Sequence, residues 1–515
     1  MSSMHGVENR GIYEDLMRKF RNEGHQVVIV TPRERRSGEH TNLTEVDGVK
    51  ILGVHTLNLQ KTSIIEKGVG QVLVESQFKN AIKKHLAGQT FDLILYSTPP
   101  ITFPKVIAYL KRRNPQARTY LLLKDIFPQN AVDLGMMSKD GVKGLLYRFF
   151  RKKEKRLYGL SDFIGCMSPA NVEYVLKHNP EIERQRVEVA PNSIEAPWPP
   201  KGEKSKDEAP WPPKGQKSKD EAPWPPKGEK SKDEAPWPPK GEKSKDEAPC
   251  PPKGEKSKDE APCPPKGEKS KDEERSPSGG SGAIRKKYGL PTDKPIFIYG
   301  GNLGKPQGIP FLISCLEQNK HRTDCHFVVI GNGTEYQKLA DWYNAKLKVE
   351  SLKFKDSSDV DSGKYEIRSS ATSPKLASDS QPSTVNCKLN ITVMKGLPKE
   401  DYDQLAKACD VGMIFLDHRF TIPNYPSRLL AYLENSMPVV CCTDPNTDVG
   451  RLAEKNGYGY WCESKNPAAF THIVNRMLAS DREAMGQRGY QFLQDNYTVD
   501  KCYDIIMMHF QTDKD

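Results

Sequence analysis

Two stretches of this chain alternate short apolar segments with amphipathic ones, and this alternation restricts the fold more than any other feature of the sequence. Residues 1–195 contain segments such as QVVIVT at 26–31 and DLILY at 92–96. Residues 283–484 repeat the pattern, for example with PIFIYG at 295–300. Segments with helical spacing follow the apolar ones, as in strand–helix units of a parallel sheet that is covered on both faces. The pattern predicts an α/β protein with two Rossmann-like, doubly wound domains.

A tandem repeat separates the two stretches. A 13-residue unit, APWPPKGEKSKDE, occurs six times with few changes from Ala196 to Glu273 and holds 18 of the 40 prolines. Its only large apolar residue is one Trp or Cys per unit, so it cannot form a core. We expect residues 196–282 to be a disordered linker. The alternative is a proline-rich ligand for an SH3-type or WW-type domain.

Two further segments depart from the alternation. Residues 349–389 are rich in Ser, Lys and Asp, and we expect them to be a surface loop inserted into the second domain. Residues 485–515 are expected to form C-terminal helices that cross back to the first domain.

Composition excludes several functional classes. The formal net charge is +11, of which the array supplies +1 through Gln216, so the other 437 residues carry +10. This mild charge suits an anionic ligand or a membrane surface better than a nucleic acid. Apolar runs are shorter than ten residues and Met1–Arg10 has no apolar core, so neither a membrane span nor a secretory signal is expected. The cysteines lack metal-ligand spacing, which favours a reduced, cytoplasmic protein without a Cys-based metal site.

A basic amphipathic segment, residues 144–160, gives the one indication of a membrane surface. It contains Phe149, Phe150, Leu157 and Tyr158 among six Lys and Arg residues. These residues are expected to lie on an anionic bilayer, which would make the protein peripheral at the membrane. The alternative is an ordinary domain helix with a solvated basic face.

Glycine-rich loops follow the first two apolar segments of the second domain. Gly301, Asn302 and Lys305 lie in the loop after residues 295–300, where backbone N–H groups and a lysine can bind an anion. The alternative is a plain strand–helix turn. Gly331 and Gly333 end the next segment and would let a ligand pass close to the backbone, although a simple turn is an equally good interpretation.

Two later loops also offer anion-binding groups. Ser427 is placed to cap a helix, so that the first N–H groups of that helix and the Arg428 guanidinium could face a phosphate. The alternative is a capped helix with a surface arginine. Asp448 begins another helix and either contacts donor hydroxyls or phosphate, or serves only as a cap.

These segments carry a resemblance to a known family. The runs GGNLGKPQG, IGNGTEYQKL, VMKGLPKEDYDQLAKACDVGMIFL, TIPNYPSRLLAYLENSMPVV and TDPNTDVG resemble the donor domain of family 4 retaining glycosyltransferases. The likeness is greatest to bacterial surface-polysaccharide transferases of the fucosamine group, which LLLKDIFPQNAVDLG in the first stretch also matches. The resemblance implies the GT-B fold, with an interdomain cleft. It also implies retaining transfer from a nucleotide-diphosphate sugar to a glycan or lipid-linked acceptor in polysaccharide biosynthesis, without an essential metal or other cofactor.

The resemblance also suggests residue roles. Asp125 takes the interdomain position at which it would act as a general base or stabilise positive charge on the sugar, unless it merely caps the next turn. The paired glutamates of the family fall on Pro423 and Ala431, and Glu434 lies one turn later. The opening apolar strand of the family has no counterpart in MSSMHGVENRG, which puts catalytic competence in question. Alternatives are a catalytically degenerate GT-B scaffold that binds through its repeats, and a nucleotide-sugar epimerase of the same fold.

Overall fold

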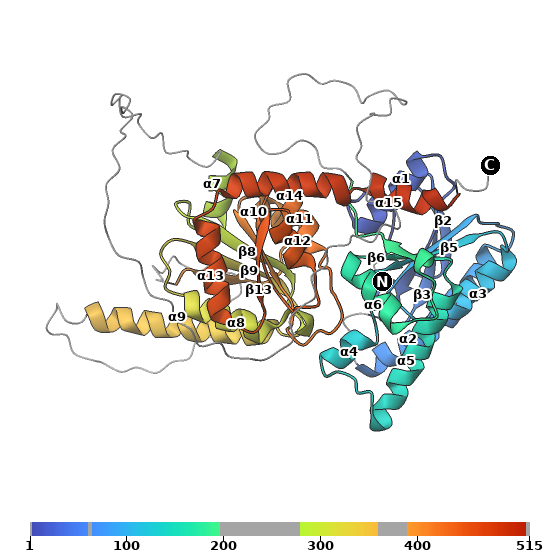
Figure 1. The fold of residues 1–515 in the computed structure, drawn as a ribbon, viewed down its shortest axis with the longest axis horizontal. Coiled ribbons are helices and arrows are strands. Elements are labelled where there is room, and N and C mark those ends of the chain that lie inside the picture. Colours follow the sequence, from blue (N-terminus) through green and yellow to red (C-terminus); the bar gives the residue numbers. More distant parts are fainter. Residues whose placement is uncertain (1–2, 60–63, 196–278, 359–388, 511–515) are drawn as a thin grey trace, which may run out of the picture. The chain divides into compact units, whose positions relative to one another are not determined.

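The structure, a computed structural model, describes residues 3–59, 64–195, 279–358 and 389–510, which belong to one compact unit. Residues 196–278 of the linker that we expected to be disordered and residues 359–388 of the second insert lie outside the described residues. Residues 279–282 correct the linker expectation, because they form the start of a helix. Figure 1 shows two α/β halves, one formed mainly by residues before the tandem repeat and the other by residues after it.

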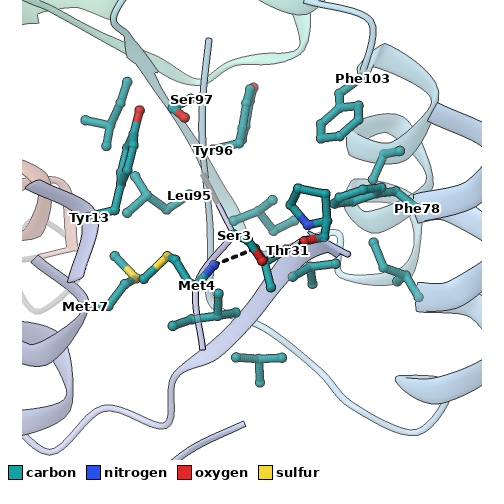
Figure 2. A pocket seen from close by; sticks show the side chains of 18 of the residues that line it. Ser3, Met4, Tyr13, Met17, Thr31, Phe78, Leu95, Tyr96, Ser97 and Phe103 are labelled. Atoms are coloured by element: carbon teal, nitrogen blue, oxygen red, sulfur yellow. Dashed lines mark hydrogen bonds between the residues drawn. The ribbon is translucent and has the colours of Figure 1, made fainter. Parts of the chain in front are cut away.

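The described strands of the first half form two sheets rather than one. A three-stranded sheet has the order β1-β3-β2, and a four-stranded parallel sheet has the order β4-β5-β6-β7. A cavity of about 870 Å³ separates β1 from β4 (Figure 2). The strands are β1 (Val28–Glu34), β2 (Asn42–Val46), β3 (Val49–Thr56), β4 (Leu93–Ser97), β5 (Arg118–Leu123), β6 (Phe163–Cys166) and β7 (Val187–Val189).

The hairpin of β2 and β3 corrects the expectation that every strand of this half is parallel. β2 runs antiparallel to β3, with Val46 opposite Val49. Asp47 and Gly48 form the turn with φ angles of 54° and 72°, the left-handed conformation that Asp-Gly pairs favour in tight hairpins. Polar residues fill most of β2, and all of them are exposed, so no apolar run signals this edge strand.

Helices of the first half arise from amphipathic segments. In α1, Leu16 and Phe20 face the core, one helical turn apart. α6 starts after Ser168, whose hydroxyl accepts a hydrogen bond from the backbone N–H of Asn171. α4 and α6 were not part of the sequence prediction. The helices are α1 (Ile12–Asn22), α2 (Ile64–His85), α3 (Pro104–Arg113), α4 (Gln129–Asp133), α5 (Gly141–Leu160) and α6 (Pro169–His178), with 3₁₀ turns η1 (Arg35–Ser37) and η2 (Arg184–Arg186).

The second half has the predicted doubly wound sheet. All its strand pairs are parallel, in the order β10-β9-β8-β11-β12-β13. Phe297 and Tyr299 of β8 pack into the core on one face, and Ile296 and Ile298 into the core on the other. The sheet is therefore covered on both sides. The strands are β8 (Ile296–Asn302), β9 (His326–Asn332), β10 (Ile391–Met394), β11 (Val411–Phe415), β12 (Val439–Thr443) and β13 (Gly459–Glu463).

Helices cover both faces of this sheet (Figure 1). The last turns of one helix, α9, correct a prediction: α9 continues to Ser358, so the insert expected to be a loop from residue 349 begins as helix. The helices are α7 (Gly279–Lys287), α8 (Ile309–Asn319), α9 (Tyr336–Ser358), α10 (Lys399–Lys407), α11 (Arg428–Glu434), α12 (Val449–Lys455), α13 (Pro467–Leu478), α14 (Arg482–Asn496) and α15 (Val499–Met507), with 3₁₀ turns η3 (Lys305–Gln307) and η4 (Met508–Phe510).

The C-terminal helix α15 packs against the first half. Its Cys502 and Ile506 lie in one apolar cluster with Leu16 of α1 and Tyr120 of β5. The backbone adds a hydrogen bond of 3.0 Å from the N–H of Ile194 to the carbonyl of Tyr497. The chain therefore returns to the first half after the second half is complete.

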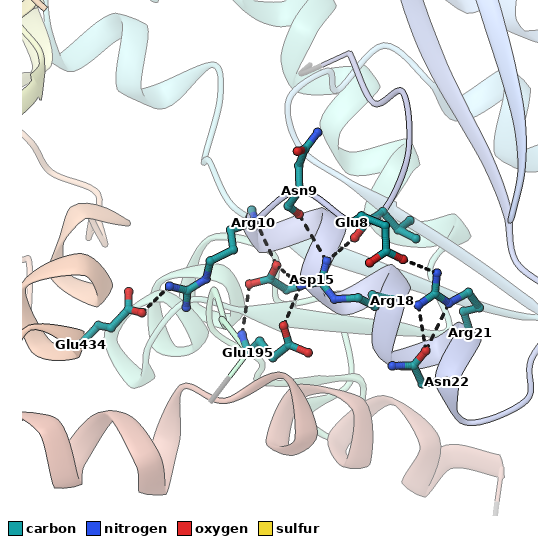
Figure 3. Close-up of polar contacts among 11 residues, drawn as sticks. Glu8, Asn9, Arg10, Asp15, Arg18, Arg21, Asn22, Glu195 and Glu434 are labelled. Carbon is teal, nitrogen blue, oxygen red and sulfur yellow. Dashed lines mark hydrogen bonds and ion pairs between the residues drawn. The ribbon is translucent and has the colours of Figure 1, made fainter. Parts of the chain in front are cut away.

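Ion pairs join the segment around α1 to residues from later parts of the chain (Figure 3). Arg18 is buried and pairs with Asp15 at 2.7 Å and with Glu195 at 2.8 Å. Arg10 reaches Glu434 of the second half at 2.5 Å. Glu434, which follows the family's glutamate positions by one turn, therefore has its carboxylate in an ion pair between the halves.

α5 corrects part of the membrane prediction. Leu157 and Tyr158 were expected on the bilayer, but they are 0% and 2% exposed and pack in the core of the first half. The N-terminal part of the helix does present an apolar face to solvent. Its exposed apolar residues are Val142, Leu145, Leu146 and Phe149. Among the described residues no helix is both long and apolar enough to cross a membrane.

Candidate active site

Loops at the carboxyl ends of strands from both halves meet around the segment that follows β11. The N–H of Asp417 in this segment donates to the carbonyl of Pro306 in the loop after β8 at 2.9 Å. Thr421 donates its N–H to the Asp133 carboxylate at 2.7 Å, which ties the segment to α4 of the first half. The Asn171 amide donates to the carbonyl of Pro423 at 2.8 Å. The structure thus joins the loops that the fold class predicts to hold the site.

The last residues of β8 have a backbone that requires glycine. Gly301 has φ +127°, a conformation that residues with a Cβ rarely adopt. A Cβ on Gly300 would lie 2.0 Å from the hydroxyl of Tyr402. A Cβ on Gly301 would meet the Arg428 guanidinium from 3.5 Å. Gly300 therefore allows close packing against Tyr402, and Gly301 lets the backbone lie directly against Arg428.

Arg428 is the residue of this loop cluster whose environment most suggests a ligand. Its Cζ lies 4.2 Å from the centre of the Tyr299 ring. The face of the ring attracts the positive charge of the guanidinium. Its Nη1 atom is buried and makes no hydrogen bond among the described residues. A buried donor of a charged group without a partner is costly. This nitrogen is therefore placed to donate a hydrogen bond to an anionic oxygen.

The predicted capping role of Ser427 is wrong. Ser427 stands at the N-cap position of α11 with helical angles, φ −61° and ψ −19°, and its side chain makes no capping hydrogen bond. A cap needs an extended residue so that the hydroxyl can turn back to the helix N–H groups. Ser427 is exposed, and the N–H of Leu429 instead donates to the carbonyl of Pro426 at 3.1 Å.

Asn302 and Lys305 lie on the exposed side of the glycine loop. The Asn302 amide donates to Gln307 at 3.2 Å, and the N–H of Gly304 donates to the same oxygen at 3.2 Å. Gln307, which the sequence did not single out, therefore fixes the loop. Lys305 begins the turn η3 with an exposed side chain, which leaves its ammonium group accessible to a ligand.

Gly331 and Gly333 have a packing role. A Cβ on Gly331 would lie 1.9 Å from the carbonyl oxygen of Gly301, and one on Gly333 would lie 2.3 Å from that of Leu303. The two glycines thus allow the ends of β8 and β9 to approach closely. Both glycines lie against the backbone at Gly301–Leu303, and their contact with a ligand stays a prediction.

Asp448 links the two halves. Its Oδ2 accepts a hydrogen bond of 3.1 Å from the N–H of Ala170 in the first turn of α6, where the helix dipole favours a negative charge. It makes no side-chain cap to its own helix α12. Burial raises the pKa of Asp448, and the N–H of Ala170 opposes this shift. Its Oδ1 is buried without a hydrogen bond among the described residues, and its contact with a ligand stays a prediction.

Asp125 follows β5 in the first half. The N–H of Asp125 donates to the Thr98 hydroxyl at 3.3 Å, and that hydroxyl donates to the Asp125 carbonyl at 3.1 Å. Its Oδ1 accepts from the Asn130 amide at 2.7 Å. Burial raises the pKa of Asp125 to about 6, against the lowering effect of Asn130 and the N–H of Ile126. A carboxyl group with this pKa can exchange a proton near neutral pH.

The sequence did not single out the neighbour of Asp125. Burial lowers the pKa of Lys124 to about 8, and its Nζ donates to the carbonyl of Ala190 at 3.3 Å. Perturbed pKa values gather at functional sites. A lysine that directly follows an apolar strand, in TYLLLKD, was the available signal.

Comparisons with known proteins bear on the fold. Residues 281–364, which include both glycine loops, match the family model "Glycosyl transferases group 1". The sucrose-phosphate synthase of Thermosynechococcus elongatus has a TM-score of 0.59 at 11% identity, covering 99% of this chain and 97% of that one. The E. coli structure "Trehalose-6-phosphate from E. coli bound with UDP-2-fluoro glucose" has a TM-score of 0.55 at 9% identity, covering 99% and 97%. The fold is that of the GT-B glycosyltransferases.

A curated relative matches part of the GT-B chain in sequence. The probable glycosyltransferase WbjE of Pseudomonas aeruginosa is 20% identical over 205 residues, which are 40% of this chain and 41% of that protein. The chain thus spans about two fifths of the relative's length. The GT-B fold predicted from the alternating pattern and the resemblance is confirmed.

Proposed function

We propose that this chain is a retaining glycosyltransferase of family 4, which moves a sugar from a nucleoside-diphosphate donor to a glycan or lipid-linked acceptor. The observation that carries the proposal is the buried, unpartnered Nη1 of Arg428 beside the Gly301 backbone. A diphosphate supplies the anionic oxygens that such a group lacks. The family match over residues 281–364 supports the assignment of this loop to the donor.

The second half would stabilise the leaving group. As the bond between the sugar carbon and the phosphate oxygen breaks, negative charge develops on the departing diphosphate. Arg428, held over Tyr299, is fixed in place before this charge appears, which makes it an effective stabiliser. Lys305 adds a mobile positive charge from the exposed side of the loop.

Asp125 would act on the acceptor side. Its carboxylate either takes the proton of the acceptor hydroxyl as the new bond to the sugar carbon forms, or stabilises positive charge on the sugar. Both roles need the ionised form. Because the pKa of Asp125 is about 6, both predict that the rate falls as the pH drops through this value.

α5 supports a lipid-linked acceptor. The exposed Leu145, Leu146 and Phe149 lie on a helix that also exposes Arg148 and Lys152. Apolar side chains flanked by cations suit the surface of an anionic bilayer. We therefore propose peripheral membrane contact through the N-terminal part of α5, rather than through its whole length.

The proposal is tested by turnover. The purified chain is incubated with UDP-, GDP-, dTDP- and ADP-sugars, and release of the nucleoside diphosphate is measured for the parent, Arg428→Gln and Arg476→Gln. Arg476 is the matched control, because its Cζ also lies over a tyrosine ring, at 4.0 Å from Tyr460. We expect Arg428→Gln to lower kcat about 10²–10³-fold and the control to leave it unchanged. No release from any donor would contradict the proposal and favour the non-catalytic scaffold.

A further inference from the structure

The cavity between β1 and β4 is a feature of the first half that the proposed function does not use. It has a volume of about 870 Å³ and extends along both strands, from Val28 to Pro32 and from Leu93 to Ser97. In Figure 2 Tyr13 and Met17 of α1 lie on one side of it, and Phe78 and Phe103 lie on the other. Apolar side chains thus cover the two faces of a slot whose remaining two sides are strand edges.

Neither edge is paired with another strand within the described residues, and at the end of β1 the Ser3 hydroxyl donates to the carbonyl of Pro32 at 3.0 Å. β1 pairs with β3 on its other side, and β4 pairs with β5. The carbonyl of Val27 accepts from the N–H of Lys50, so by alternation the backbone groups of Val28 and Val30 point the opposite way, towards the cavity. The carbonyl of Asp92 likewise accepts from Arg118, which turns the backbones of Leu93 and Leu95 towards the cavity from the other side.

Two rows of backbone donors and acceptors that face an apolar slot limit what can fill it. Backbone polar groups removed from water need hydrogen-bond partners. An acyl chain would cover the apolar faces but leave both rows unpaired. An extended peptide offers alternating N–H and C=O groups to both sides at once, and side chains to both faces. The slot therefore offers the apolar faces and the backbone hydrogen-bond partners that one more strand would need.

Residues 1–515 do not contain an unused segment of this kind. The stretches outside the described residues include no run of three residues from the apolar set Ala, Val, Ile, Leu, Met, Phe, Trp, Tyr and Cys. A strand buried on both faces needs a nearly continuous apolar run. The occupant must therefore be supplied from outside these residues.

We propose that this slot binds an extended, apolar peptide strand of about five residues, which pairs with β1 and β4 and joins the two sheets of the first half into one. The length follows from β4, which has five residues. Uncharged, branched side chains such as Val, Ile and Leu fit a site that Phe78 and Phe103 cover on one face and Tyr13 and Met17 on the other. The proposal concerns the first half alone and does not rest on the donor site.

The test is binding of a fluorescent peptide, KVIVIVK, to the full chain, followed by amide hydrogen exchange. We expect saturable binding and at least about tenfold slower exchange of the N–H groups on both edges, because pairing protects them from solvent. The reporting amides are Val28, Val30, Leu93 and Leu95. The matched control is KVIPIVK, whose central proline lacks the N–H needed for pairing, and we expect it to bind at least about tenfold more weakly.

A protein variant tests the same pairing from the other side. Val30→Pro removes a donor that faces the slot and leaves the bonds of β1 to β3, and we expect it to weaken peptide binding about tenfold without loss of far-UV circular dichroism. Absence of saturable binding to the parent, protection of one edge only, or equal binding of both peptides would overturn the proposal. So would protection of the same amides by laurate or by dimerisation without peptide. Nucleoside-diphosphate binding, measured separately, reports on the second half and is independent of these outcomes.

Discussion

The raised pKa of Asp125 makes a quantitative prediction about the substitution Asp125→Asn. A carboxyl group whose pKa is about 6 in the folded chain and 3.8 ordinarily binds its proton more tightly when folded. The folded state is therefore penalised when the group must ionise. The difference between the two values corresponds to about 3 kcal/mol. The substitution removes this penalty and keeps an oxygen that can accept from the Asn130 amide.

The sign of the effect depends on pH. Below pH 3.8 the carboxyl group is protonated in both states, so the parent and the variant should have similar free energies of unfolding. As the pH rises to about 6, the unfolded chain releases the proton first and the parent loses stability. Above that pH the variant should be more stable than the parent by up to about 3 kcal/mol.

The assay is urea denaturation of both proteins at several pH values from 4 to 8, combined with nucleotide release at each pH. We expect the stability difference to grow with pH, and we expect the variant to lose turnover although it is more stable. The Asn130→Leu variant is a second check, because loss of its hydrogen bond should raise the pKa of Asp125 further. A stability difference that does not change with pH, or a destabilised variant at pH 8, would refute the reasoning.

Two further predictions concern the glycine loop and the membrane face. Gly301→Ala should lower the free energy of unfolding by about 1–3 kcal/mol, measured by urea denaturation, because of the strained φ of +127°. Gly304→Ala, at an ordinary φ of −110°, should cost less, and an equal cost would contradict the argument. The double variant Leu145→Ser, Leu146→Ser should reduce co-sedimentation with anionic vesicles at least about tenfold, whereas Leu43→Ser, at an exposed site on β2, should not.

Much of the fold could be predicted because its buried strands are apolar runs that can be recognised in the sequence. In the second half the central strands β8, β9, β11 and β12 are buried on both faces over most of their length, and apolar runs such as CHFVVI at 325–330 therefore stand out from the sequence. β2 was missed because it is an exposed edge strand of mostly polar residues. The Asp47-Gly48 pair was the signal that could have revealed it.

The site could be predicted at the level of loops, but not of every side chain. Arg428 and Gly301 are adjacent in the structure, as their shared assignment to the donor requires. The capping role given to Ser427 failed because capping depends on the backbone angles of one residue, which a Ser at a helix start does not determine. Asp448 could not be placed from its own segment, because its partner Ala170 lies in the other half of the chain.

The central claim is that the Gly301–Arg428 region binds a nucleoside diphosphate, and calorimetric titration tests it most directly. UDP, GDP, dTDP and ADP are titrated into the parent, Arg428→Gln and Arg476→Gln proteins. We predict that the parent binds at least one of them, that Arg476→Gln binds it equally, and that Arg428→Gln binds it at least about tenfold more weakly. Equal binding by the parent and Arg428→Gln, or no binding of any nucleoside diphosphate by the parent, would contradict the account.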